Sequence, residues 1–201
     1  KMKKLAILGA SYLQKPLVEK ANSMHIETHC FAWENEESVC KEIADFFYPI
    51  SVLEKELIYE KCKEIIIDGI TTIATDICVP TISYVAEKLG LNANSYQTSI
   101  WSTNKSEMRK IFEINQVKCP KAIAIKNLSE LNILSLNFPL IVKPTDRSGS
   151  RGISKVVNEL ELENAVEYAL SESIEKKVIV EEFIDGKEIS VETISWQGVH
   201  Y

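Results

Sequence analysis

The sequence lacks the features of a membrane-bound or secreted protein. No apolar run among its 201 residues approaches the roughly 20 that a membrane-spanning helix requires. The chain enters a strand-like segment at once, without the pattern of a signal peptide. We therefore expect a cytoplasmic protein with no membrane partner.

An excess of positive charge is also missing. The 29 Asp and Glu residues outnumber the 23 Lys and Arg residues, so the formal net charge at pH 7 is −6. An acidic chain has no general attraction to nucleic acid or to anionic membranes. The sequence therefore predicts no nucleic-acid partner, and a phosphate site would have to be a local basic pocket.

Metal-binding patterns of cysteine and histidine are absent. The cysteines are odd in number, scattered and never arranged as Cys-x-x-Cys, which is typical of reduced, mostly buried thiols: Cys30, Cys40, Cys62, Cys78 and Cys119. His25 and His29 lie in a segment that fits a strand better than a helix. We expect no zinc site.

The glycine fingerprint of dinucleotide-binding proteins is incomplete. Of the three glycines in G-x-G-x-x-G only Gly9 is present, because Ser11 and Gln14 occupy the other two positions. A nicotinamide-dependent dehydrogenase is therefore a disfavoured alternative.

The first half of the chain nevertheless has the pattern of a doubly wound parallel sheet. Strands are predicted over residues 3–10, 26–33, 47–50 and 64–70, and helices over residues 13–24, 37–46, 53–62 and 79–89, the last ended by Gly90. Such alternation implies right-handed crossovers and ligand-binding loops at the carboxyl edge of the sheet. Gly9, Ser11, Thr75 and Asp76 should lie there, where turn and helix-capping roles are favoured over ligand binding.

The second half is predicted to mix helices and strands. A connector rich in Ser, Thr and Asn is expected over residues 92–103, helices from Asn104, over residues 129–136 and from Asn158, and strands over residues 121–126 and 139–143.

A lysine and a small-residue loop follow the strand over residues 139–143. Lys143 ends this apolar strand, and Gly149 and Gly152 let the loop behind it bend closely around a ligand. Ser148 and Ser150 can donate further hydrogen bonds. The combination suits phosphate oxygens, although an ordinary loop beside a solvated lysine explains this segment alone equally well.

Two cations lie at the start of the helix that begins near Asn104. Lys105 and Arg109 are one turn apart on the same face. A helix N-terminus favours acidic side chains, so two cations there indicate an anion nearby.

Residues 177–192 are predicted to form two strands around an Asp185-Gly186 turn. The segment carries three acids, Glu181, Glu182 and Glu188, which taken singly would be expected on a solvated face.

The order and spacing of these parts resemble the ATP-grasp superfamily, in its carbamoyl-phosphate synthase large chain and biotin carboxylase branch. The resemblance covers most of the chain. It implies an α/β protein, with a Rossmann-like pre-ATP-grasp domain over residues 1–100 and the N-terminal part of an ATP-grasp domain over residues 101–201.

The resemblance also implies roles for individual residues. Lys105 and Lys143 would bind the triphosphate together with loop residues Ser148, Gly149, Ser150 and Gly152, and Arg109, as the catalytic residue, would hold the reacting phosphoryl group or acyl phosphate. Glu181 would bind the adenine amino group, and the backbone of Glu182 and Ile184 would bind the adenine edge. Phe183 and Ile141 would form the wall of the apolar slot that holds the adenine ring, and Glu188 would bind the ribose. The loop departs from the unbroken glycine run of biotin carboxylases, which implies a stiffer and more charged lid.

The reaction implied is ligation of C–N bonds. ATP phosphorylates a small carboxylate substrate, and an amine or ammonia attacks the acyl phosphate. The magnesium ligands of the family, a Glu and a Glu-x-Asn pair, are not found in the sequence and are expected beyond residue 201, so we expect this chain alone to bind nucleotide weakly and to catalyse nothing. A homodimer is left open, and the alternative function is a non-catalytic nucleotide-binding or regulatory module.

Overall fold

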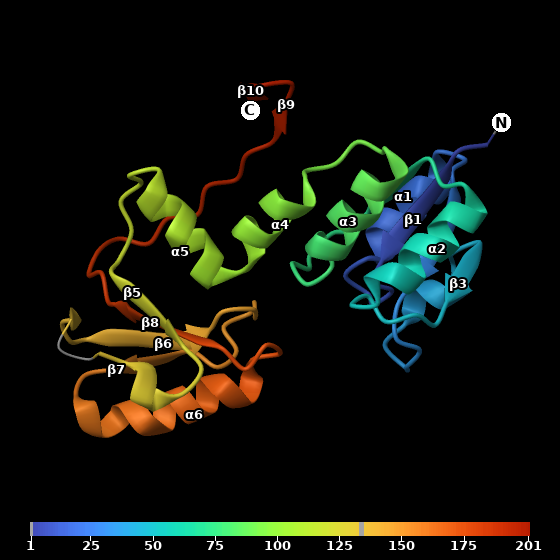
Figure 1. Ribbon diagram of the computed structural model, residues 1–201. Helices are drawn as coiled ribbons and strands as arrows, with labels where there is room; N and C mark the ends of the chain where they lie inside the picture. The colour runs from blue at the N-terminus through green and yellow to red at the C-terminus, as the bar shows by residue number, and fades with distance from the viewer. Residues whose placement is uncertain (1, 133–134) are drawn as a thin grey trace.

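The computed structural model describes residues 2–132 and 135–201, and it contains two four-stranded sheets joined by helices α4 and α5 (Figure 1). The first sheet is parallel and the second is antiparallel. The predicted α/β fold class is therefore confirmed. The predicted division at residues 100 and 101 stays a prediction, and it falls inside α4.

The first sheet contains β1 (Lys4–Leu8), β2 (Glu27–Phe31), β3 (Phe46–Tyr48) and β4 (Gly69–Thr71) in the order β3-β2-β1-β4. Helix α1 (Lys15–Ser23) covers one face, and α2 (Lys55–Ile65) and α3 (Val79–Leu89) cover the other. The chain moves outward from β1 to β3 and then returns to β4 on the other side of β1. This reversal creates a switch point at the carboxyl ends of β1 and β4.

The sequence predicts the end of α3 correctly but places the end of α2 too early. The helix predicted over residues 79–89 is confirmed, with Gly90 at a φ of 67° after its last turn. The strand predicted over residues 64–70 is wrong in its first part, because α2 continues to Ile65 and Ile66 takes a φ of 60°. The run of three isoleucines resembles a strand, yet only residues 69–71 pair with β1.

The helix predicted over residues 37–46 is also wrong. Only a 3₁₀ turn over Val39–Glu42 forms. The backbone beyond it is held by β2 instead, since Asp45 donates its N–H to Thr28 Oγ1 and accepts the Thr28 N–H at 2.8 Å. Side-chain bonds of this kind compete with helix formation.

Helix α4 (Tyr96–Thr103) occupies most of the segment predicted as a connector. Ser95 caps it by accepting the Thr98 N–H, and the hydroxyls of Ser99, Ser102 and Thr103 bond to carbonyls one turn back. Polar composition alone is therefore a poor guide here. Helix α5 (Lys105–Ile114) follows, and Asn104 caps it as predicted by accepting two backbone N–H groups.

The second sheet contains β5 (Ala122–Ile125), β6 (Leu140–Pro144), β7 (Ser154–Val156) and β8 (Val178–Glu182) in the order β5-β8-β6-β7. Helix α6 (Leu162–Glu172) packs on one face of this sheet, and α5 lies on the side of the other face (Figure 1). Where a helix was predicted over residues 129–136, a 3₁₀ turn forms over Leu128–Glu130, and residues 133–134 lie outside the described part.

The hairpin predicted over residues 177–192 is wrong in its second half. After β8 the chain leaves the sheet as an extended segment and ends in the short pair β9 (Ser195–Trp196) and β10 (Val199–His200) (Figure 1). Alternation suggested a strand, but Ile189 and Val191 are exposed and bury their side chains against no core. Within the described residues, no helix combines the length and apolar character needed to cross a bilayer.

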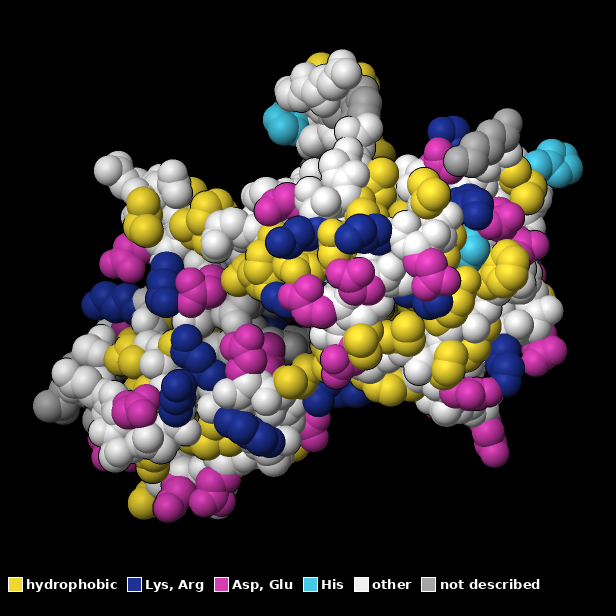
Figure 2. All heavy atoms as spheres, turned by 45° about the vertical axis from the view of Figure 1, so that its right-hand side comes forward, with side chains coloured by type: hydrophobic (Ala, Val, Ile, Leu, Met, Phe, Trp, Pro, Cys, Tyr) yellow, Lys and Arg dark blue, Asp and Glu magenta, His cyan; other side chains and the backbone are white. Residues whose placement is uncertain are grey.

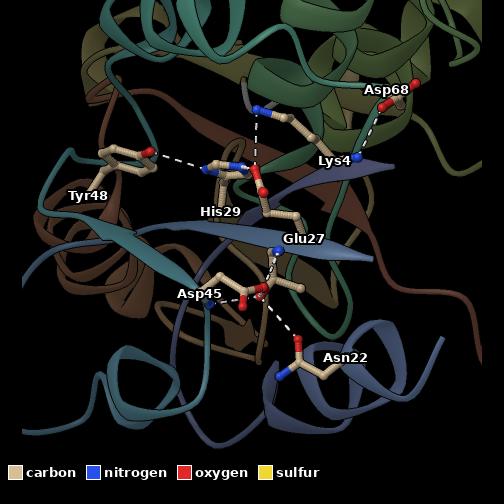
Figure 3. A network of polar contacts seen from close by, with 8 residues as sticks. Lys4, Asn22, Glu27, His29, Asp45, Tyr48 and Asp68 are labelled. Atoms are coloured by element: carbon tan, nitrogen blue, oxygen red, sulfur yellow. Dashed lines mark hydrogen bonds and ion pairs between the residues drawn. The ribbon is translucent and has the colours of Figure 1, made fainter. Parts of the chain in front are cut away.

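His29 in β2 is a buried histidine within a polar network (Figure 3). Its Nε2 lies 2.9 Å from Glu27 Oε1 and its Nδ1 lies 3.1 Å from the Tyr48 hydroxyl. Lys4 Nζ approaches the same Glu27 oxygen at 3.2 Å. The hydrogen bond from His29, reinforced by Lys4 and opposed by burial, holds the pKa of Glu27 below its usual value. Both ring nitrogens of His29 have hydrogen-bond partners within the fold, so a structural role explains this buried histidine.

We expect Glu27→Gln to lower the free energy of unfolding at neutral pH but not in acid. A carboxylate with a lowered pKa stabilises the fold above its unfolded-state pKa, and this contribution is lost as pH falls through the folded-state value. Denaturant unfolding at neutral pH and at the acid end tests this, with the exposed-acid variant Glu60→Gln as control. An equal deficit at both pH values would contradict it.

Candidate functional site

A buried carboxylate lies at the centre of the candidate site. Glu181, on β8, is 3% exposed, and its two oxygens contact two different cations. Lys143 Nζ lies 2.6 Å from Oε2, and Arg109 Nε lies 2.7 Å from Oε1. A carboxylate buried this deeply requires such partners.

Strand register explains why Lys143 and Glu181 meet. Ile141 pairs with Glu181 and Lys143 pairs with Ile179 in the antiparallel ladder, so all four side chains lie on one face of the sheet. The intervening Val142 and Val180 point to the other face, where they join the core beneath α6. The face with the charged residues is the one on the α5 side.

Lys105 reaches the same site from the first turn of α5. Its backbone N–H donates to Thr145 O at 2.8 Å, and its ammonium group donates to the carbonyl of Arg147. Burial, and then the charge of Lys143, lower the pKa of Lys105, while Asp146, Asp76 and Glu181 oppose the shift. Two ammonium groups that repel one another in a half-buried place are stabilised by a bound anion.

The small-residue loop is anchored at both ends and open in the middle. Asp146 accepts from Ser173 Oγ at 3.0 Å, and Arg147 Nε donates to Glu172 O at 2.6 Å. Gly152 has a φ of 70°, and a Cβ there would lie 2.8 Å from Pro144 Cγ, so only glycine fits. The tip, with Ser148, Gly149 and Ser150, is exposed. These residues are open to solvent, whereas Lys105 and Lys143 are half-buried.

The residues assigned to the adenine base and the ribose do not all lie beside the cationic residues. Phe183 donates its N–H to Pro139 O, and Glu182 accepts from the backbone and side chain of Asn137. Ile184 and Glu188 are exposed on the extended segment. The structure thus brings together Lys105, Lys143, Arg109 and Glu181, but leaves Glu188 apart from them.

Sequence reasoning missed Lys155. It pairs with Ile141 on the same face of the sheet, and its Nζ lies 3.5 Å from the centroid of the Phe183 ring. Its position as the exposed residue of the alternating strand β7 was a usable signal. A cation at this place borders the slot assigned to the base.

One cavity borders this site, and another lies in the first half of the chain. One of about 660 Å³ lies between α5 and β5 and is lined in part by Arg109 and Ile179. The other, of about 220 Å³, lies at the carboxyl edge of the first sheet, where Gly9, Ser11 and Thr75 all line it. The expectation that these residues share this edge therefore agrees with the structure.

Gln14 explains why the loop after β1 does not suit a dinucleotide. Its side chain is buried, donates to Ile73 O at 2.7 Å and accepts from Ser11 Oγ at 2.8 Å. A Cβ on Gly9 would lie 2.9 Å from Gln14 Cδ, so the amide packs directly over the glycine. The space that a third fingerprint glycine would leave open is filled.

Metal ligands are not gathered in the described part of the chain. Among residues 2–132 and 135–201, no group of three or more His, Cys, Asp or Glu side chains could hold a metal ion. Four of the cysteines are buried and Cys119 is half-buried, all with free thiols, which agrees with the expectation of mostly buried, reduced cysteines. Burial raises the pKa of Cys30 and Cys62 to about 12, which makes their thiols unreactive.

On the face seen in Figure 2, Lys and Arg side chains are interspersed with Asp and Glu side chains, and apolar side chains are visible among them. Because the net charge of the chain is −6, the positive charge at Lys105, Lys143 and Arg109 is a local feature.

Sequence comparison identifies related proteins. The family described as "D-ala D-ala ligase C-terminus" matches residues 110–198. The chain is 30% identical over 193 residues to the formate-dependent phosphoribosylglycinamide formyltransferase of Prochlorococcus marinus (strain NATL2A), a match that covers 91% of this chain and 48% of the relative. It is 29% identical over 154 residues to the carbamoyl phosphate synthase large chain of Caldanaerobacter subterraneus subsp. tengcongensis, covering 75% of this chain and 14% of the relative.

Structural comparison agrees. The crystal structure of phosphoribosylglycinamide synthetase from Anaerococcus prevotii is similar, with a TM-score of 0.65 and 26% identity over 92% of this chain and 47% of that one. The chain thus spans less than half the length of these relatives.

The two lysines should differ in what they contribute to stability. We expect Lys143→Met to lower the free energy of unfolding by about 1–3 kcal/mol, because it leaves the buried Glu181 with one partner. Lys105→Met should cost less than about 1 kcal/mol, since it removes a charge that burial and Lys143 disfavour.

Denaturant unfolding of both variants measures this difference, with Lys110→Met on the exposed side of α5 as control. A larger loss for Lys105→Met than for Lys143→Met would contradict the arrangement.

Proposed function

Because this chain belongs to the ATP-grasp superfamily, we propose that it is the nucleotide-binding part of an ATP-dependent carboxylate ligase of the carbamoyl-phosphate synthase-like type. The substrates and the activity are proposed for the whole protein, because this chain spans less than half the length of these relatives. The reaction is phosphorylation of a carboxylate by ATP to give an acyl phosphate and ADP, followed by displacement of phosphate by an amine or ammonia to form a C–N bond.

One observation carries the proposal: Lys105 from the first turn of α5 and Lys143 from β6 come from separate elements to one place, where Lys105 donates to the carbonyl of Arg147 and Lys143 contacts Glu181. Lys143 is paired with Glu181, whereas the ammonium group of Lys105 donates to a backbone carbonyl, so an anionic ligand would supply the opposite charge at Lys105. A triphosphate has this character, and lysine ammonium groups can follow its oxygens as point charges.

Each element contributes a separate task. Lys105 and Lys143 bind phosphate oxygens, and Arg109 holds the reacting phosphoryl group. The exposed tip of the loop, with Ser148, Gly149 and Ser150, closes over the phosphates, while the buried Gly152 holds the base of the loop. Closure of such a loop excludes water from the transferred group.

Glu181 has a different task from the one that the resemblance implies. Both of its oxygens are engaged by Lys143 and Arg109, so it orients these two cations. Contact with the adenine amino group would compete with these ion pairs. The backbone of Glu182 and Ile184, the ring of Phe183, Ile141 and the carboxylate of Glu188 remain our assignments for base and ribose.

Magnesium supplies charge neutralisation at the phosphates in this superfamily. The described residues provide no cluster to hold it, and no step is assigned to the metal.

Nucleotide binding tests the proposal. Calorimetric titration with a non-hydrolysable ATP analogue should show weak binding that Lys105→Met and Lys143→Met each reduce about tenfold or more, because one charge-assisted hydrogen bond is worth about 1.5–3 kcal/mol. Lys110→Met, one residue beyond Arg109 and pointing to solvent, should bind as the unmodified chain does.

Equal affinity in all four proteins would refute the assignment. We also expect no magnesium-dependent ATP turnover by this chain alone, and turnover would show that the active site lies elsewhere. Binding by the full-length protein without ligase activity on any carboxylate would favour the non-catalytic module.

A further inference from the structure

The larger cavity, of about 660 Å³, forms where the chain turns back from α5 into β5. Gln116 takes a φ of 57° beyond the end of α5, and the Val117 N–H donates back to Phe112 O at 2.8 Å. A helix end of this kind reverses the direction of the chain. Residues 116–121 therefore line the cavity together with α5, and β5 lines it from the sheet.

Two alanines leave space between β5 and α5. Ala122 pairs with Glu181 and Ala124 pairs with Ile179, so both alanines lie on the face of the sheet that carries Glu181. This is the face on the α5 side, where larger side chains would fill the gap. The floor of the cavity is therefore apolar, and it extends to Ala122, directly opposite Glu181.

Most of the charged residues around this cavity are cations. Among the described residues, one acid and four basic residues line it: Glu113, Arg109, Lys110, Lys118 and Lys121. Lys118 and Lys121 are exposed, and within the described part of the chain neither forms an ion pair. An apolar floor beneath an excess of positive charge suits an anion with an apolar body.

Arg109 belongs both to this cavity and to the cationic site. Its Nε donates to Glu181 Oε1 at 2.7 Å, and its Nη1 contacts Met108 Sδ at 3.8 Å. A guanidinium group has five N–H donors, so donors remain on its two Nη atoms. These donors are accessible, because no described side-chain nitrogen is buried without a partner. A carboxylate in the cavity can therefore bind Arg109 without breaking the ion pair with Glu181.

We infer that this cavity is a second anion site, which binds a small carboxylate with an apolar body and opposes nucleotide binding. The apolar body lies over Ala124 and Ile179, and Arg109 binds the carboxylate. Because Arg109 is also assigned to the reacting phosphoryl group, the two anions share one cation and repel each other. Binding in the cavity is independent of the proposed function, whereas the opposition to the nucleotide rests on it.

Two probes of similar shape and different charge test the site: 4-phenylbutanoate and its uncharged amide, 4-phenylbutanamide. Each is titrated into the isotopically labelled chain, and backbone amide shifts are followed at Lys118, Ala122 and Ala124. The carboxylate should bind about tenfold more tightly than the amide, because hydrogen bonds from cations to a carboxylate are about twice as strong as neutral ones.

The double variant Lys118→Met, Lys121→Met should weaken binding of phenylbutanoate about fivefold, since it removes two cations and keeps the apolar floor. Binding of the amide should not change. The matched control is Lys20→Met, Lys187→Met, which alters the net charge equally at two exposed lysines that do not line the cavity. It should change the affinity for the carboxylate by less than about twofold, because salt screens distant charges.

Titration with the ATP analogue, in the presence and absence of saturating phenylbutanoate, tests the opposition. The bound carboxylate should weaken nucleotide binding about two- to fivefold, and the amide should have no effect. Lys105→Met should still bind phenylbutanoate, which separates the cavity from the phosphate site.

Equal affinity for the two probes, equal effects of the two double variants, or loss of phenylbutanoate binding in Lys105→Met would each overturn the inference. Unchanged nucleotide affinity with the carboxylate bound would overturn it too. Nucleotide binding without carboxylate binding defeats this inference alone, whereas carboxylate binding by a chain that binds no nucleotide defeats the proposed function.

Discussion

The carboxylate of Glu181, buried between Lys143 and Arg109, is the interaction on which the site depends. It fixes the middle of α5 to the face of the second sheet and gives two long, flexible cations a defined direction. The same ion pairs leave Lys105 without a carboxylate of its own, so that it donates to a backbone carbonyl instead. The cations are thus positioned before a ligand binds, and Lys105 still lacks a negatively charged partner. A phosphate ligand would supply that partner.

The sequence predicted the parts of the fold that have a clear period and a clear end. The parallel sheet, α3 with Gly90 after it, and the Asn104 and Asn158 caps follow from local chemistry. The wrong predictions of helices and strands fall where contacts between distant parts of the chain determine the local structure. Asp45 hydrogen-bonds to Thr28, which prevents the helix predicted there. Serine hydroxyls stabilise α4 within a segment whose polar composition suggested a connector. After Glu182 the alternating apolar side chains meet no core, so no strand joins the sheet.

The site was predictable to a similar degree. Lys105, Arg109 and Lys143 were identified from helix start, spacing and strand end, and the structure brings them together. The pairing of Glu181 with two cations could not be read from the sequence, because it depends on the register between β6 and β8 and on where α5 crosses the sheet. The contact of Lys155 with the Phe183 ring depends on the pairing of β6 with β7 and on where the chain runs after β8, so only the alternation of β7 pointed to it in the sequence.

A crystal structure of this chain with a non-hydrolysable ATP analogue tests the central claim most directly. The account predicts that Lys105 Nζ and Lys143 Nζ both lie about 2.7–2.9 Å from phosphate oxygens, with Lys105 released from the Arg147 carbonyl. Phosphates bound elsewhere, with Lys105 still on that carbonyl and Lys143 on Glu181 alone, would contradict it.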